Sequence, residues 1–139
     1  MTFLSERLAD LRRHLDHLAE LRGRVAGPES LRRDLSLAND VLHSLLVVSQ
    51  RVIDIAAELS TRRGLRFEDF QEAVRNLAIY EEFPDALIRR LEPLPELRNH
   101  LLFAVAGPAE LERAVDLLVR LDGVERFAQG VARLAQKRG

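Results

Sequence analysis

Leucines recur every three or four residues through the first part of the chain. Charged residues fill most of the positions between them, and the leucines are Leu4, Leu8, Leu11, Leu15, Leu18 and Leu21. Because an α-helix turns once every ~3.6 residues, this spacing puts them on one face. The pattern predicts an amphipathic helix that ends at Gly23 or at Gly27-Pro28, since glycine and proline interrupt helices.

A second helical stripe begins near Pro28 and continues to Leu59 with the same three-and-four stepping. Proline suits the first turn of a helix, where its missing N–H is not needed. Between Val41 and Ala57 apolar residues cover most of the circumference. A helix that is apolar nearly all round is buried on several sides. We therefore expect it to be the central helix of a bundle or to lie in a subunit interface.

Shorter apolar stripes fill the rest of the chain. They predict helices over residues 67–80, 84–91, 96–105 and 111–134, with Asp122-Gly123 as the place where the last one kinks. No strand pattern or repeat interrupts them. Short connections favour antiparallel neighbours. The predicted fold is all-α, an antiparallel up-and-down helical bundle of four to five helices that forms a single domain over residues 1–139.

The charge balance gives no general reason to expect a nucleic-acid-binding protein. The net charge is −1, and among 21 basic residues only Lys137 is a lysine. Arginine suits bidentate contacts with phosphate, but we favour a compositional bias of the genome as the explanation. The chain has no cysteine, and no apolar run approaches the roughly 20 residues that span a bilayer. We expect a cytoplasmic protein without a membrane segment, and we expect no metal and no cofactor.

The most informative segment covers residues 97–105 and reads Leu-Arg-Asn-His-Leu-Leu-Phe-Ala-Val. It resembles the signature of the HepT-like HEPN family, the toxins of toxin–antitoxin pairs. That signature has Arg-Asn, three mostly apolar residues, His, any residue and Tyr. Arg98 and Asn99 match it, whereas Phe103 stands at the His position and Val105 at the Tyr position. The helix around residues 50 and 54 and the aromatic residue at position 127 are also similar, so the resemblance covers about residues 28–137.

The resemblance implies metal-independent RNA cleavage by a homodimer, in which the Arg and His residues of two protomers share one cleft. Arg98 would hold the scissile phosphate, and the family's Tyr is where a partner nucleotidyltransferase, the antitoxin, adds AMP. Phe103 cannot move a proton as the family's His does, and Val105 has no hydroxyl. The resemblance thus implies a toxin ribonuclease with weakened or lost RNA cleavage. The alternative is a non-catalytic dimeric helical module that binds a nucleotidyltransferase.

Three histidines each have two competing explanations. His100 lies three residues before Phe103, and residues three apart are neighbours on a helix surface. It could act as a displaced base, although a lone histidine near a helix start is usually a surface or capping residue. His14 and His17 lie one turn apart, a spacing that could begin a metal site. Without a third ligand, a solvated polar face explains them better.

Asp54 is a further candidate, one helical turn from Gln50 in the apolar helix. A buried carboxylate needs partners, and Arg51 and Arg98 are the candidates. The functional interpretation is that Asp54 orients Arg98 at the cleft. The structural interpretation is an ion pair or an interface hydrogen bond.

Overall fold

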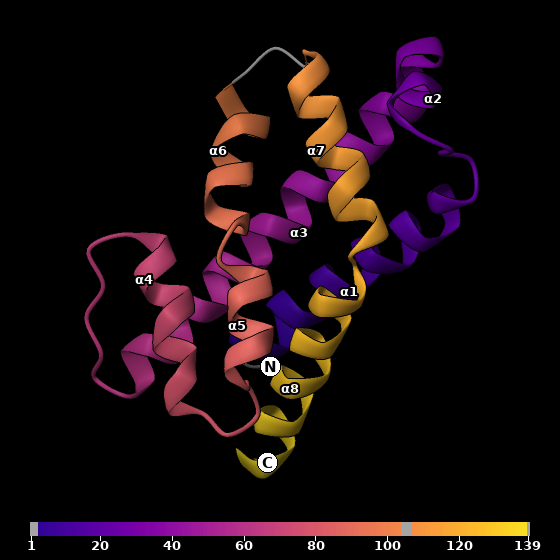
Figure 1. Ribbon diagram of the computed structural model, residues 1–139. Helices are drawn as coiled ribbons and strands as arrows, with labels where there is room; N and C mark the ends of the chain where they lie inside the picture. Colours follow the sequence, from indigo (N-terminus) through magenta and orange to yellow (C-terminus); the bar gives the residue numbers. More distant parts are fainter. Residues whose placement is uncertain (1–2, 104–106, 139) are drawn as a thin grey trace.

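The computed structural model describes residues 3–103 and 107–138, and in them it contains helices and no strand. Four segments run up and down in turn (Figure 1). They are α1 (Phe3–Arg22), α3 (Leu35–Arg62), the consecutive α5 (Asp85–Leu91) and α6 (Leu94–Phe103), and the consecutive α7 (Pro108–Val119) and α8 (Asp122–Arg138). Helix α1 packs on α3 and α8, α3 packs on α6, and α5 packs on α8. The predicted all-α antiparallel bundle is confirmed.

Three short elements occupy the connections between these segments. They are α2 (Pro28–Arg33), α4 (Phe70–Arg75) and the 3-10 helix η1 (Asn76–Ile79). The predicted helix over residues 67–80 therefore starts later than expected. The Asp69 carboxylate accepts a hydrogen bond from the backbone N of Glu72 at 2.8 Å. This bond satisfies an N–H that has no partner within the helix, and it fixes the start of α4.

The single helix predicted from Pro28 to Leu59 is wrong in one respect, because it is two helices that meet at Asp34. Asp34 has φ −131° and ψ 98°, an extended conformation that ends α2. Its carboxylate accepts a hydrogen bond from the backbone N of Leu37 at 3.1 Å and so caps α3. The last predicted helix divides in the same way, since α7 ends at Val119 and α8 begins at Asp122. The apolar spacing continues across both breaks. Only the second break was indicated by the sequence, as the kink predicted at Asp122-Gly123.

The apolar surface of α3 is buried within the chain itself. Val41, Leu45, Val48, Val52 and Ile55 are all fully buried, between α1 on one side and α6 on another. The expectation of a central helix is confirmed. The all-round apolar pattern of α3 is thus explained by packing inside one chain and needs no second subunit.

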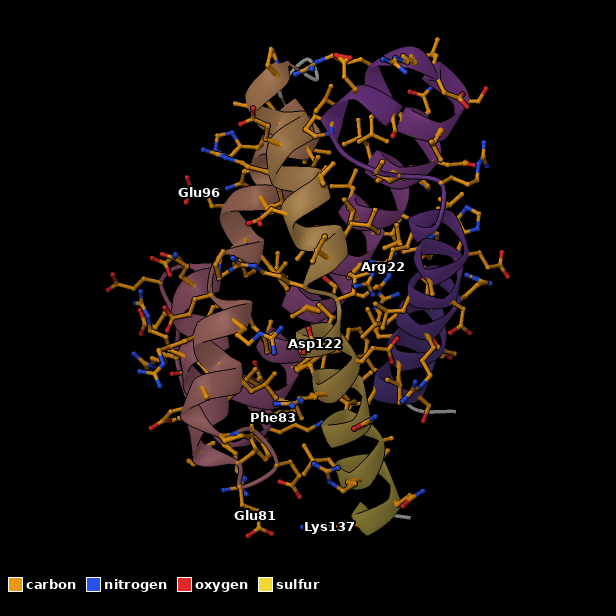
Figure 2. All side chains as sticks on the ribbon, turned by 45° about the vertical axis from the view of Figure 1, so that its right-hand side comes forward. Arg22, Glu81, Phe83, Glu96, Asp122 and Lys137 are labelled. Carbon is orange, nitrogen blue, oxygen red and sulfur yellow. The ribbon has the colours of Figure 1, made fainter. Side chains whose placement is uncertain are left out.

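The C-terminal helix packs closely against the segment before α5. A Cβ atom at Gly130 would lie 2.7 Å from Cε1 of Phe83, which is closer than carbon atoms approach. The Phe83 ring also lies 5.4 Å from the ring of Phe127, between α5 and α8 (Figure 2). Glycine lowers helix stability relative to alanine, so its presence here reflects this close approach. Among the described residues, no helix is long and apolar enough to cross a membrane.

Candidate functional site

Arg98 lies on α6 at the edge of a shallow pocket of about 370 Å³. Its Nη1 donates a hydrogen bond to Oε1 of Gln50 on α3 at 3.1 Å. The guanidinium carbon lies 5.4 Å from the ring centroid of Phe70, within reach of a cation–π interaction. Besides Arg98, the pocket is lined by Asp69, Phe70, Gln71, Pro95, Glu96 and Asn99. The structure thus places the two matching motif residues, Arg98 and Asn99, at one pocket.

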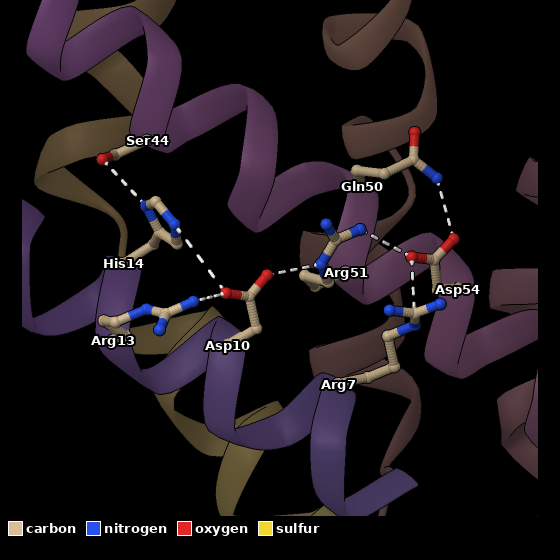
Figure 3. Close-up of polar contacts among 8 residues, drawn as sticks. All are labelled: Arg7, Asp10, Arg13, His14, Ser44, Gln50, Arg51 and Asp54. Atoms are coloured by element: carbon tan, nitrogen blue, oxygen red, sulfur yellow. Dashed lines mark hydrogen bonds and ion pairs between the residues drawn. The ribbon is translucent and has the colours of Figure 1, made fainter. Parts of the chain in front are cut away.

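Arg98 is held in place by a chain of hydrogen bonds among side chains of α3. Gln50 Nε2 donates to Oδ1 of Asp54 at 2.9 Å, and Oδ2 of Asp54 accepts from Nη1 of Arg51 at 2.8 Å. Arg7 approaches the same Asp54 oxygen at 3.8 Å, as Figure 3 shows. Of the two partners expected for Asp54, Arg51 contacts it directly and Arg98 only through Gln50.

The same network continues to α1, where a second carboxylate, Asp10, is paired with two arginines. Arg51 Nε donates to Oδ2 of Asp10 at 2.7 Å, and Arg13 also contacts Asp10 (Figure 3). The hydrogen bond from Arg51 holds the pKa of Asp10 below its usual value, against the opposing effect of burial. Asp10 and Arg51 are both largely buried, with side chains 21% and 24% exposed. This half of the network is a structural ion-pair cluster that joins α1 to α3.

The charge of Arg98, by contrast, is not neutralised by a carboxylate in contact with it. In the described part of the chain Gln50 is its one hydrogen-bond acceptor, and the buried Nε has no partner. The two carboxylates at the pocket have other contacts. Asp69 caps α4, and Glu96, which projects from α6 away from the bundle (Figure 2), lies 3.4 Å from His100 Nε2. Arg98 therefore keeps free N–H groups for an anion.

The remaining motif residues lie farther from this arrangement. Asn99 is exposed beside Arg98. His100 is not among the pocket residues, and its side chain is 36% exposed and faces Glu96 one turn earlier. Phe103 ends α6, but its side chain, like Val105 as a whole, lies outside the described residues. A role for His100 as a displaced base stays a prediction.

The two histidines of α1 differ in their surroundings. His14 is half-buried, with Nδ1 3.1 Å from Oγ of Ser44 and its ring 5.9 Å from that of His43. Burial lowers the pKa of His14. His17 fits the solvated face expected for both, with Nε2 3.9 Å from Asp40. Among the described residues, no group of three potential ligands could hold a metal ion.

Sequence patterns do not reveal the contribution of α1 to this network. Arg7 and Asp10 are polar residues beside the leucine stripe, and nothing in their spacing distinguishes them from solvated charges. Phe70, an apolar residue of the predicted helix over residues 67–80, is 36% exposed and lies against Arg98. Gln50 could have been suspected, because an amide one turn before an acid on an otherwise apolar helix needs a partner.

No protein-family model and no curated protein matches the sequence, but several solved structures share its fold. A tri-AMPylated Shewanella oneidensis HEPN toxin in complex with MNT antitoxin matches with a TM-score of 0.80 and 18% identity, over 96% of this chain and 99% of its own. A toxin–antitoxin complex with AMP-PNP gives a TM-score of 0.78 and 21% identity, over 95% and 98%. A tyrosine-to-alanine mutant of the MntA–HpeT toxin–antitoxin gives 0.78 and 18%, over 94% and 97%. This chain therefore has the fold of HEPN toxins, as its sequence resemblance implied.

Proposed function

We propose that this chain is the HEPN toxin of a toxin–antitoxin pair, that Arg98 binds a phosphate group of RNA, and that the replacement of the motif histidine by Phe103 weakens RNA cleavage. The observation that carries the proposal is the contact between Arg98 and a neutral amide rather than a carboxylate. The shared fold supplies the context.

A neutral partner fixes an arginine without neutralising its charge. Asp54 holds Gln50, and Gln50 holds Arg98, so the guanidinium is oriented before a ligand arrives. Groups that are oriented in advance stabilise a bound or developing negative charge without having to reorganise. The charge of Asp54 is itself matched by Arg51. Arg98 therefore retains a full positive charge toward the pocket, as a phosphate-binding residue requires.

One protomer alone makes a weak phosphate site, because Arg98 shares the pocket with the carboxylates of Asp69 and Glu96. A second protomer that brings its own Arg98 to the same cleft would reverse this balance. The face around Arg98 is suited to such a contact, since Phe70 is 36% exposed and Leu102, one turn after Arg98, is 49% exposed. A second protomer on this face would remove both apolar side chains from water, which favours association. We propose a homodimer through this face of α4 and α6.

Light scattering tests the homodimer. The native protein should have about twice the 15.8 kDa mass of the chain, and Leu102→Glu should shift it to the monomer, because a charge there would be buried in the interface. Val119→Glu is the matched control, since Val119 on α7 is 60% exposed and lies away from this face. A native protein that is monomeric at micromolar concentration would refute the dimer.

RNA cleavage tests the catalytic part of the proposal. Wild-type cleavage should be absent or weak, and Phe103→His should raise it, because a positioned general acid or base contributes about 10²–10⁴ in rate. Adding Arg98→Ala to this variant should abolish the gain, whereas Arg66→Ala, on an exposed loop, should not. Robust wild-type cleavage that survives Arg98→Ala would disprove the assignment of Arg98. His100→Ala in the wild type tests the displaced base.

The partner is a proposed nucleotidyltransferase antitoxin, and the two proteins should co-purify from the cytoplasm. Since Val105 has no hydroxyl, mass spectrometry after co-expression should find no AMP within residues 97–106. An adduct in that segment would contradict this expectation. If Phe103→His gives a folded dimer that binds the partner but cleaves no RNA, the non-catalytic binding module becomes the better description.

A further inference from the structure

A second recess adjoins α6, and Glu96 lies at the edge of both this recess and the Arg98 pocket. This groove, of about 480 Å³, is bounded by α5 and α6 on one side and by α7 and α8 on the other. Its apolar lining comes from Pro93, Leu94, Leu97, Leu117 and Val124. Small-molecule sites are typically mostly apolar and about 300–1,000 Å³ in volume, with a few polar groups that fix orientation. The groove matches that description in size and lining.

Arginines from α5 and from the α7 side line the same groove, and they are not equally paired. Arg90 forms two hydrogen bonds with the Asp122 carboxylate, at 3.0 and 2.5 Å, at the junction of α7 and α8 (Figure 2). Arg120 lies 3.7 Å from Asp116. In the part of the chain that the structure describes, Arg89 and Arg113 have no hydrogen bond and no ion pair. Two arginines without a carboxylate partner thus line the groove. Its lining also includes two carboxylates, Glu96, which contacts His100, and Asp116, which contacts Arg120.

Solvated arginines on a flat surface would need no explanation. Here they lie beside apolar side chains that a ligand can cover, and a guanidinium binds phosphate and carboxylate groups through paired N–H donors. We propose that the groove binds an amphiphilic organic anion, with its apolar body on Leu94, Leu97 and Leu117 and its phosphate or carboxylate group on Arg89 and Arg113. Arg98 and Asn99 do not line the groove, so the two proposed sites use different arginines, although Glu96 lies at the edge of both.

Fluorescence titration of the full-length protein with anilinonaphthalene sulfonate, an aromatic anion, tests the site. Binding should saturate, and the double variant Arg89→Gln/Arg113→Gln should weaken it at least about tenfold, a loss of roughly 1.4 kcal/mol. The matched control Arg33→Gln/Arg66→Gln removes two exposed arginines outside the groove and should leave the affinity unchanged. Circular dichroism of both variants checks that they fold. Binding that does not saturate, or that is unchanged in the groove variant, overturns the proposal.

Competition experiments show how much the apolar body and the anionic group of the ligand each contribute to binding. They also show which anionic group is preferred. Phenyl phosphate and hexanoate should each displace the probe, and the stronger competitor shows whether phosphate or carboxylate is preferred. Inorganic phosphate, which has no apolar body, should compete at least about tenfold less well. Equal competition by inorganic phosphate, or no displacement by either amphiphile, would overturn the proposed ligand class.

Discussion

Arg51 and Arg98 belong to one hydrogen-bonded network, yet their surroundings differ in kind. Arg51 contacts the carboxylates of Asp10 and Asp54, at 2.7 and 2.8 Å. Arg98 contacts the amide of Gln50 and the ring of Phe70. Carboxylate partners neutralise an arginine, which then serves to hold helices together. A neutral partner orients an arginine and leaves its charge available to a ligand.

The same contrast recurs around the groove beside α6. Arg90 is paired with Asp122 and packs closely on α8, since a Cβ atom at Gly123 would lie 3.2 Å from Arg90 Nε. Its sequence neighbour Arg89 has no partner among the described residues. Two adjacent arginines thus divide into one that joins α5 to α8 and one that remains available to a ligand.

The largest expected difference between Arg51 and Arg98 is in their contribution to the free energy of unfolding. Arg51→Ala leaves Asp10 and Asp54 without their shared partner, which should lower the free energy of unfolding by about 2 kcal/mol, between the values for exposed and fully buried ion pairs. Arg98→Ala removes one hydrogen bond and also an unpaired buried Nε, so its effect should stay within about 0.5 kcal/mol. Urea denaturation measures both. Equal losses would show that Arg98 is as structural as Arg51.

Orientation by Gln50 should have the next largest effect, and it should appear in binding. Gln50→Met keeps the side-chain length and the net charge but removes the amide that holds Arg98. We expect the affinity for a labelled single-stranded RNA, measured by fluorescence anisotropy, to fall about tenfold, or roughly 1.4 kcal/mol. Gln129→Met, an exposed change on α8, is the control. If Gln50→Met binds RNA as the wild type does, the amide contact has no role in positioning.

Local pattern accounts for much of the fold and for part of the site. Helical spacing of apolar residues predicted the four long segments. The motif singled out Arg98 and Asn99, and both line one pocket. The break at Asp34 was not predicted, because an apolar stripe can continue from one helix into the next when both pack on the same core. The break between α7 and α8 lies next to Asp122-Gly123, where the sequence predicted a kink. The turn geometry and the capping bond decide such breaks.

Contacts between distant segments could not be predicted in this way. Gln50 and Arg98 are 48 residues apart, and Asp10 and Arg51 are 41 apart. Periodicity places each residue on a face of its own helix but does not say which polar residue of another helix lies opposite. The contact between Gly130 and Phe83 is of the same kind, although a glycine inside a helix is a sign that something packs closely there.

A smaller effect should appear in the salt dependence of RNA binding. Each phosphate that a protein binds on single-stranded RNA releases counterions and contributes about 0.7 to the slope of log affinity against log salt concentration. Arg98→Ala should therefore reduce the slope by about 0.7 for each phosphate that Arg98 binds in the wild type. Arg51→Lys, which keeps a cation within the paired cluster, should leave the slope unchanged. If the slope fell equally in Arg98→Ala and Arg51→Lys, the proposed difference between a phosphate-binding Arg98 and a structural Arg51 would be wrong.

The smallest expected effect is a pH dependence confined to the paired end of the network. Burial lowers the pKa of His14, and nearby Asp10 opposes that shift. Ser44, His43, Arg13 and His17 complete the polar and charged surroundings of the ring. A lowered pKa in the folded state means that the unfolded chain binds more protons in this range. The stability from neutral His14 is therefore complete above the unfolded pKa of about 6.5 and is lost as the pH falls through the folded value.

Urea midpoints measured from about pH 7.5 down to about pH 5.5 test this dependence, since the range begins above the unfolded pKa of about 6.5 and continues below it. His14→Asn keeps a hydrogen-bonding side chain near Ser44 but cannot titrate, so its midpoint should fall less steeply than that of the wild type. His17→Asn changes an exposed histidine and should retain the wild-type slope. Arg98→Ala should retain it too, because Arg98 meets the network only through the neutral Gln50. If Arg98→Ala flattened the pH dependence of the urea midpoint, Arg98 would be electrostatically coupled to the paired cluster around Asp10 and Arg51. Gln50 would then not separate the charge of Arg98 from the charges of that cluster.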